Sequence, residues 1–191
     1  TLVIEQHQSL YLDELESLII KVNLFGFHFA SLDIRQNSKI HDAVFKDIYD
    51  FYIKSNESVF PKNYYDLSEQ DKFEVLSNVK GALNPDDFEN EITRLTIESI
   101  QAIKVIQGNN GELGANRYII SNNENALNVM ETFALIRLSD WENPTVDVVP
   151  LFESVDDLLN AHNVMEQLYT NPVYANHLVN REMKQTIMLG F

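Results

Sequence analysis

The segment "VDVVPLFESVDDLLNAHNVMEQLY", residues 146–169, encodes a strand and a helix with almost no loop between them. Its first part, 146–154, is a short apolar run, typical of a parallel strand that is covered on both faces. Ser154 then predicts a helix start, because its hydroxyl can accept from a first-turn amide and Asp157, three residues later, completes a capping-box pattern. A strand followed at once by a capped helix indicates a parallel α/β fold.

Three other stretches extend this pattern. "RYIIS", residues 117–121, predicts a strand, and "ENALNVMETFALIRL" after it carries apolar residues at helical spacing. Upstream, residues 27–35 begin with aromatic and small side chains at period two and predict a strand, followed by a helix that Ser38 would cap. "QTIMLGF", residues 185–191, predicts a fourth strand.

The other segments predict helices and loops. Apolar spacing predicts a helix over residues 9–24, before the first strand. Ser68 and Asp71 predict the capped start of a short helix, and Pro85 lies in the first turn of a predicted long helix. Residues 107–116, rich in glycine and asparagine, predict a loop.

Four short strands alternating with helices are compatible with a doubly wound sheet or an α/β barrel. No Gly-x-Gly-x-x-Gly turn follows a strand, which weakens a dinucleotide-binding interpretation. A complete (β/α)₈ barrel takes about 250 residues, so this chain would form about half of one. We therefore expect a helix-rich α/β fold, a partial TIM barrel of about four parallel strands with inserted helices. The start at Thr1 and the apolar end add the expectation of a piece from a longer protein.

The composition excludes several classes of function. The chain has 29 acidic and 14 basic residues and a formal charge of −15, so nucleic acid and anionic membrane surfaces are not expected partners. It has no cysteine, which excludes disulfides and thiolate chemistry. No run of about 18 apolar residues and no signal segment occur, so we expect a cytoplasmic protein without a membrane span.

Polar residues stand at the ends of the predicted strands, where the reaction site of a (β/α)₈ barrel lies. Arg35 ends the first strand, and its planar guanidinium suits phosphate or carboxylate. The alternative is a structural ion pair with Asp33, two residues earlier on the same strand face. Glu153 ends the third strand and would either bind a cation or form a salt bridge at the rim.

Other polar residues give weaker indications. Ser121 ends the second strand, where a hydroxyl usually caps the following helix. The 5 histidines show no metal-ligand spacing, so each is interpreted as structural or exposed. No Gly-x-Ser-x-Gly elbow or phosphate-cradling loop is present.

Four stretches together resemble the phosphoenolpyruvate carboxylase family. "FGFHFASLDIRQNSKIH", residues 25–41, resembles the family signature F-G followed by L-D-I-R-Q-x-S-x-x-H. "RYIISNNENALNVM" (117–130) looks like the family's Y-V-I-S strand and helix, and residues 148–174 are similar to its V-P-L-F-E-T-x-x-D-L segment. "QTIMLGF" looks like its M-L-G-Y strand. The departures are small: Ser154 stands where threonine is usual, Phe191 where tyrosine is usual, and "SNN" at 121–123 replaces the more apolar S-M-A. We interpret them as changes in local packing rather than in chemistry.

The resemblance implies a biotin-free, Mg²⁺-dependent, carbon-fixing lyase on a (β/α)₈ barrel. Such an enzyme joins bicarbonate to phosphoenolpyruvate and gives oxaloacetate and phosphate. The resemblance implies that Arg35 is a catalytic, phosphate-binding residue and that Glu153 binds the metal. It also implies that the second metal carboxylate belongs to a Y-S-D-S-x-K-D motif that would begin at Phe191, and that the catalytic histidine lies outside this chain.

On this resemblance the whole chain, residues 1–191, is a central fragment of such a barrel. Residues 25–55 would form a first strand–helix unit, 56–116 the inserted helices and loop, and 117–191 further units. The full enzyme would use Mg²⁺ or Mn²⁺ and form a homotetramer. We expect the isolated chain to be inactive and to hold no metal alone, since groups of a catalytic site act as a unit.

Two alternatives remain open. The chain could be a non-catalytic, acidic helical interaction module derived from such a barrel; the coding sequence beyond Phe191 would distinguish this from the enzyme. Another barrel lyase that uses phosphoenolpyruvate would also keep an arginine and a carboxylate at the rim. Such a lyase is not expected to reproduce both the L-D-I-R-Q and the V-P-L-F-E strings.

Overall fold

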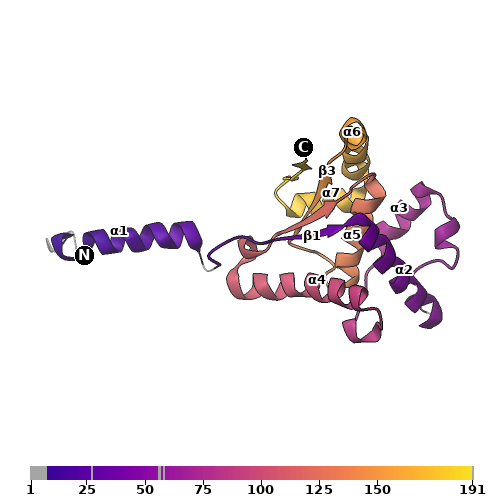
Figure 1. Cartoon of the computed structure of the whole chain (residues 1–191), viewed down its shortest axis with the longest axis horizontal. Helices are drawn as coiled ribbons and strands as arrows, with labels where there is room; N and C mark the ends of the chain where they lie inside the picture. Colours follow the sequence, from indigo (N-terminus) through magenta and orange to yellow (C-terminus); the bar gives the residue numbers. More distant parts are fainter. Residues whose placement is uncertain (1–7, 27, 56, 58, 191) are drawn as a thin grey trace.

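The computed structural model describes residues 8–26, 28–55, 57 and 59–190, and Figure 1 shows its arrangement. Predictions for Phe27 and Phe191 therefore lie outside the described residues. The helices and strands, in chain order, are α1 Gln8–Phe25, β1 Asp33–Asn37, α2 Ser38–Ser55, α3 Glu69–Asn78, α4 Glu91–Asn110, β2 Arg117–Ser121, α5 Ala126–Leu138, β3 Asp147–Phe152, α6 Val155–Thr170, α7 Pro172–Asn180 and β4 Met188–Leu189.

The described strands form one parallel sheet of four, in the order β1-β2-β3-β4. Asp33 pairs with Arg117, which pairs with Asp147, so the first three strands start level with one another. Each strand lies beside the next one in the sequence, whereas a doubly wound sheet reverses its direction at a switch point. The predicted helix-rich α/β fold with four parallel strands is therefore confirmed, and it is consistent with part of a barrel.

The two faces of the sheet differ in their covering. Tyr118, Ile120, Val148 and Phe152 are buried in the main core together with apolar residues of the helices. Strand side chains alternate between faces, so the residues between them point the other way. There Ile119, Val149 and Leu151 form a small separate cluster. The main core therefore lies on the face that carries the helices.

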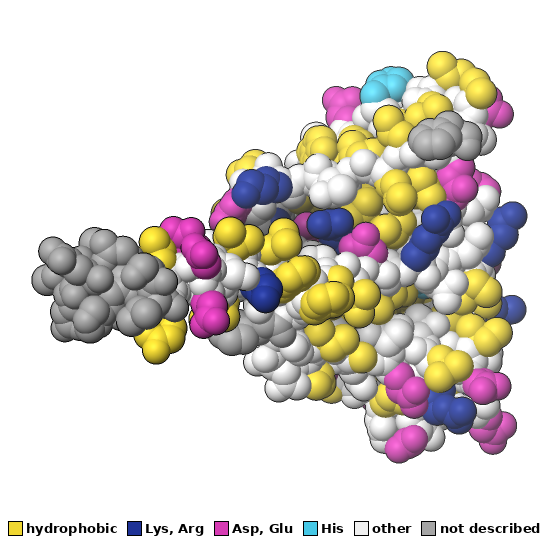
Figure 2. Space-filling view, turned by 60° about the vertical axis from the view of Figure 1, so that its left-hand side comes forward, with side chains coloured by type: hydrophobic (Ala, Val, Ile, Leu, Met, Phe, Trp, Pro, Cys, Tyr) yellow, Lys and Arg dark blue, Asp and Glu magenta, His cyan; other side chains and the backbone are white. Residues whose placement is uncertain are grey.

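Several large apolar side chains are exposed on the described part of the chain. On α1, Leu18, Ile20 and Leu24 are exposed, and the helix projects away from the sheet and the other helices (Figure 1). Apolar side chains are also spread among the charged ones on the face shown in Figure 2. No described helix combines the length and apolar character needed to cross a membrane.

The prediction of a strand over residues 27–35 is wrong in its position. β1 begins only at Asp33, and Phe29 before it is 77% exposed with a left-handed φ of 60°. The reason lies in the neighbouring strand: β2 begins at Arg117, opposite Asp33, so earlier residues have no partner strand. A period-two pattern cannot form a strand without a partner for its backbone groups.

Some predicted boundaries are confirmed and others shift. Ser68 caps α3 and Ser154 caps α6 through a complete capping box. The long helix α4 begins at Glu91 rather than at Pro85, because Pro85–Asp87 forms a separate 3₁₀ turn and Asn90 caps α4. The same helix continues to Asn110, into the predicted loop. The last strand is reduced to Met188–Leu189 within the described residues.

Candidate active site at the carboxyl ends of the strands

Arg35 and Glu153, predicted separately as site residues, lie beside each other. The prediction that Arg35 ends the first strand is wrong, because β1 continues to Asn37 and Arg35 is its central residue. Glu153 directly follows β3, as predicted. The distance from Arg35 Nη2 to Glu153 Oε1 is 3.8 Å, and the side chains are 51% and 43% exposed. An exposed pair at this separation contributes about 0–1 kcal/mol to stability. The contact is therefore loose, and both groups remain accessible to a ligand.

The predicted alternative of an Arg35–Asp33 ion pair is wrong. Asp33 instead contacts Arg117, with Oδ1 and Nη1 3.5 Å apart, because the parallel register sets these residues opposite each other. The alternative of a rim salt bridge for Glu153 is realised, and its partner is Arg35. The two pairs lie on one face of the sheet but at successive levels along the strands.

The backbone of two other connections borders Glu153, and one of them bonds to it. The backbone N–H of Asn122 donates to Glu153 Oε1 at 3.0 Å. Gly190, after β4, lies so close that a side chain there would come within 3.2 Å of the Glu153 Cα. That separation is tighter than most side chains tolerate, so a glycine suits this position. Glu153 is thus held between β1, the end of β2 and the end of β4.

Neither predicted serine cap at the first two strands is observed. The Ser121 hydroxyl donates to the Gln36 carbonyl at 3.4 Å, while Asn125 caps α5. The Ser38 hydroxyl donates to the Asn122 carbonyl at 2.6 Å, and the Asn37 side chain accepts from the first turn of α2 instead. Both hydroxyls therefore join neighbouring strand ends rather than cap their own helices.

A hollow of about 700 Å³ opens beside Glu153. Its lining includes Asn37, the last residue of β1, and Asn122 and Glu124 from the connection after β2. Carboxylate and amide oxygens favour a hard divalent cation, whereas the Arg35 guanidinium favours an anion. However, no cluster of three metal-ligating side chains occurs among the described residues. Glu153 therefore fits the role of one oxygen ligand, and further ligands would have to come from elsewhere.

His41, which matches the family signature, is buried in a closed hydrogen-bond chain. Its Nδ1 lies 3.0 Å from the Thr132 hydroxyl and its Nε2 lies 3.0 Å from the Tyr118 hydroxyl. Thr132 donates to the Asn128 carbonyl, so His41 Nδ1–H donates to Thr132 and Tyr118 donates to Nε2. Burial lowers the pKa of His41 to about 4, so the ring is neutral at pH 7. The structural interpretation of this histidine is confirmed.

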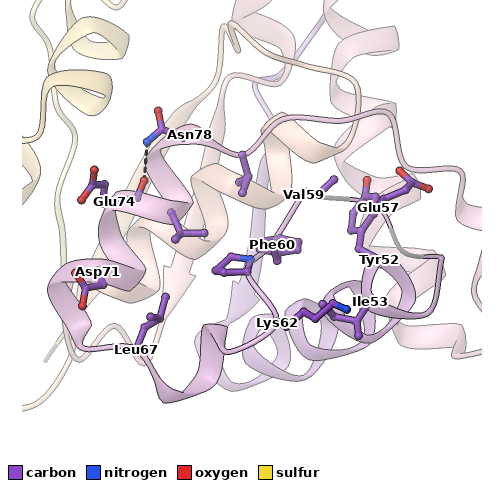
Figure 3. A pocket seen from close by; sticks show the side chains of 13 residues that line it. Tyr52, Ile53, Glu57, Val59, Phe60, Lys62, Leu67, Asp71, Glu74 and Asn78 are labelled. Atoms are coloured by element: carbon purple, nitrogen blue, oxygen red, sulfur yellow. Dashed lines mark hydrogen bonds between the residues drawn. The ribbon is translucent and has the colours of Figure 1, made fainter.

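Another hollow, of about 810 Å³, shares no lining residue with the one beside Glu153 (Figure 3). Its lining residues come from α2, from α3, from the segment between them and from Val79, which follows α3. Figure 3 shows Tyr52 and Phe60 among apolar groups, with Lys62 and Glu74 at the margin. Its lining contains neither predicted site residue.

Comparisons with known proteins show which family these features belong to. The family model described as "Phosphoenolpyruvate carboxylase" matches residues 1–191. The chain belongs to the phosphoenolpyruvate carboxylase family. It is 32% identical to a phosphoenolpyruvate carboxylase of Nitrosomonas eutropha over 98% of its length, and 35% identical to one of Gloeobacter violaceus over 93%. It spans only 21% and 19% of these relatives, respectively, so it corresponds to about a fifth of such an enzyme.

Several residues of this family fragment were not found from the sequence. Asn122 has a left-handed φ of 55°. It bonds to Ser38, Glu124 and Glu153, which follow β1, β2 and β3, respectively. The only signal was the "SNN" departure from the family pattern, which was interpreted as a packing change. Arg117 and Gly190 also went unnoticed, because their roles depend on strand register and close backbone approach.

Proposed function

We propose that this chain forms part of the active site of a phosphoenolpyruvate carboxylase. In the proposal Arg35 binds the phosphoryl group of phosphoenolpyruvate and Glu153 is one ligand of Mg²⁺ or Mn²⁺. The observation that carries it is the 3.8 Å approach of Arg35, within β1, to Glu153, after β3, in a chain that matches this family throughout.

The chemistry of Arg35 supports its role. Phosphoenolpyruvate and bicarbonate are anions, and the protein carries a net charge of −15, so binding needs a local positive group. The half-exposed guanidinium of Arg35 presents several donors in one plane, which matches a phosphoryl group. Its weak pairing with Glu153 leaves these donors available. Holding the phosphoryl group as it moves to bicarbonate would place Arg35 among the groups that stabilise the transition state.

The position of Glu153 supports a metal-binding role. When bound, a divalent cation would stabilise the negative charge of the enolate that forms from phosphoenolpyruvate. Glu153 is held by the Asn122 amide and lies close to Gly190, and it lines the hollow of about 700 Å³. A fixed carboxylate at the margin of an oxygen-lined hollow suits a cation adjacent to an anion on Arg35.

The rest of the proposed site would come from the remainder of the enzyme. The sheet supplies four strands of the proposed (β/α)₈ barrel, with residues 25–55, 56–116 and 117–191 as its successive parts. The second metal carboxylate, the catalytic histidine and the other strands would be contributed outside this chain. The complete enzyme is proposed to be cytoplasmic and homotetrameric. The isolated chain is expected to show no turnover, since groups that act as a unit lose activity together.

Oxaloacetate formation tests this proposal. The 191-residue chain and a complete enzyme that carries it would each receive phosphoenolpyruvate, bicarbonate and Mg²⁺. We expect turnover only from the complete enzyme, and a Glu153→Gln variant should need at least about tenfold more Mg²⁺ for half-maximal rate. Turnover by the chain alone would refute the division of the site. An unchanged Mg²⁺ requirement in the variant would refute the role of Glu153.

A further inference from the structure

Asn122, between β2 and α5, adopts a backbone conformation that few residue types favour. Its φ of 55° lies in the left-handed region, where asparagine is tolerated, glycine is unstrained and β-branched residues are strongly disfavoured. This conformation determines where the N–H of residue 122 points. The N–H donates to Glu153 Oε1 at 3.0 Å, across the gap to the end of β3.

The remaining polar groups of Asn122 fasten it to the neighbouring connections. Its carbonyl accepts from the Ser38 hydroxyl at 2.6 Å, and its Nδ2 donates to Ser38 Oγ at 3.3 Å. Nδ2 also donates to Glu124 Oε1 at 3.0 Å. Asn122 therefore connects the start of α2, its own loop and the residue after β3.

The bond from Asn122 affects the two oxygens of Glu153 differently. Oε1 accepts from the Asn122 N–H and also faces Arg35 Nη2 at 3.8 Å. Oε2 makes no hydrogen bond within the described part of the chain. One oxygen is thus used to hold the carboxylate, and the other is left for a ligand.

We infer that Asn122 is a positioning residue that holds Glu153 Oε1 through its left-handed backbone N–H and so presents Oε2 to a divalent cation. The cation part rests on the proposed function, whereas the hydrogen bond does not. The chain uses here a polar residue where the family pattern has an apolar one. Groups that orient a metal ligand typically change metal affinity by about 10–100-fold when they are lost.

Hydrogen exchange in the 191-residue chain tests the bond itself. We expect the residue-122 amide to exchange at least about tenfold faster in Glu153→Ala than in the wild type, since its acceptor is gone. The amide of Ile119, within β2, serves as the control and should keep its rate. Equal exchange of the residue-122 amide in both proteins would overturn the inference.

The Mg²⁺ dependence of the complete enzyme tests the positioning role. Asn122→Gly keeps the left-handed backbone and therefore the direction of the N–H. Asn122→Val keeps an N–H but disfavours the left-handed backbone, so the N–H should turn away from Glu153. We expect the Mg²⁺ concentration for half-maximal rate to rise about tenfold or more in Asn122→Val and to stay within about threefold of wild type in Asn122→Gly. A purely structural role would lower thermal stability without this difference.

The outcomes separate this inference from the proposed function. Equal Mg²⁺ requirements in the two variants would overturn the positioning role. If the complete wild-type enzyme does not carboxylate phosphoenolpyruvate, the proposed function is wrong. In that case the exchange of the residue-122 amide still decides whether Asn122 holds Glu153.

Discussion

The two ends of β3 carry arginine–carboxylate contacts of opposite character. At its start, Arg181 Nε lies 2.6 Å from Asp147 Oδ1, and Arg181 Nη1 lies 2.6 Å from Glu112 Oε1. The Arg181 side chain is only 9% exposed. Past the other end, Arg35 and Glu153 are 3.8 Å apart, and the Arg35 side chain is 51% exposed. Arg181 therefore lies between two carboxylates at short distance, whereas Arg35 has one carboxylate partner at a longer distance.

This difference indicates different roles for the two arginines. A buried, short, doubly paired guanidinium has no donor to spare for a ligand, and it joins segments that are far apart in the sequence. An exposed, loosely paired guanidinium contributes little to stability and can exchange its partner for an anion. We therefore assign the Arg181 contacts to the fold and keep the role in the reaction as the proposal for Arg35, and the following predictions test that division.

The largest effect on stability is expected at Arg181, which contacts both Asp147 and Glu112. Arg181→Met should lower the free energy of unfolding by about 3 kcal/mol, because the largely buried Asp147 loses its charged partner. The half-exposed Glu112 adds little to this loss. Urea unfolding measures this loss. Arg181→Lys is the matched control and should restore part of it by keeping the charge. A loss below about 1 kcal/mol in Arg181→Met would contradict the structural role that we assign to the Arg181 contacts.

The second prediction concerns His177, which is close enough to Arg181 and Asp147 to feel their charges. Burial, followed by the charge of Arg181, lowers its pKa to about 4. The unfolded state, with a pKa of about 6.5, then binds the proton first, so stability falls as pH drops from about 6.5 to 4. His177→Gln should reduce the stability difference between pH 7 and pH 5 by about 2 kcal/mol. Urea titrations at both pH values would show it, and an unchanged difference would contradict the assignment.

A smaller effect on stability is expected at Asn123, which is next to Asn122 in the connection after β2. Its side chain is fully buried, and neither its Nδ2 nor its Oδ1 has a hydrogen-bond partner within the described residues. Asn123→Ala should raise the free energy of unfolding by about 1 kcal/mol, because the removed desolvation cost exceeds the cost of the small cavity. Asn123→Asp is the control and should destabilise. A loss of stability in Asn123→Ala would show that the amide has a partner.

The smallest effect on stability is expected at Arg35 itself. Arg35→Met should change the free energy of unfolding by less than about 0.5 kcal/mol, since the pair with Glu153 is exposed and long. The same urea measurement that detects the Arg181 change would measure it. A loss as large as that expected for Arg181→Met would mean that both ends are structural.

The sequence predicted an element well where the signal lies entirely within the element or at its boundary. The pairing of Ser154 with Asp157 predicted the start of α6, and the apolar run 117–121 predicted β2. The strand over residues 27–35 was misplaced because its start depends on where β2 begins, about 80 residues away. Period and composition carry no information about that register.

The site could be predicted only in part for a related reason. Arg35 and Glu153 stand at recognisable positions, at a strand and a strand end, and the family strings marked both. Their contact with each other, and that of Asp33 with Arg117, follow from the register of separate strands. Asn122 was missed because its left-handed backbone and its bonds to Ser38 and Glu153 arise only when three connections meet.

The kinetics of Arg35→Met in the complete enzyme test the central claim most directly. Arg117→Met is the matched control, since Arg117 lies on the same sheet face but at the opposite end of the strands. We predict that kcat/KM for phosphoenolpyruvate falls about 100-fold or more in Arg35→Met, a loss of about 2.7 kcal/mol of transition-state stabilisation, and changes less than about threefold in Arg117→Met. Equal kcat/KM values in Arg35→Met and the wild type would contradict the account.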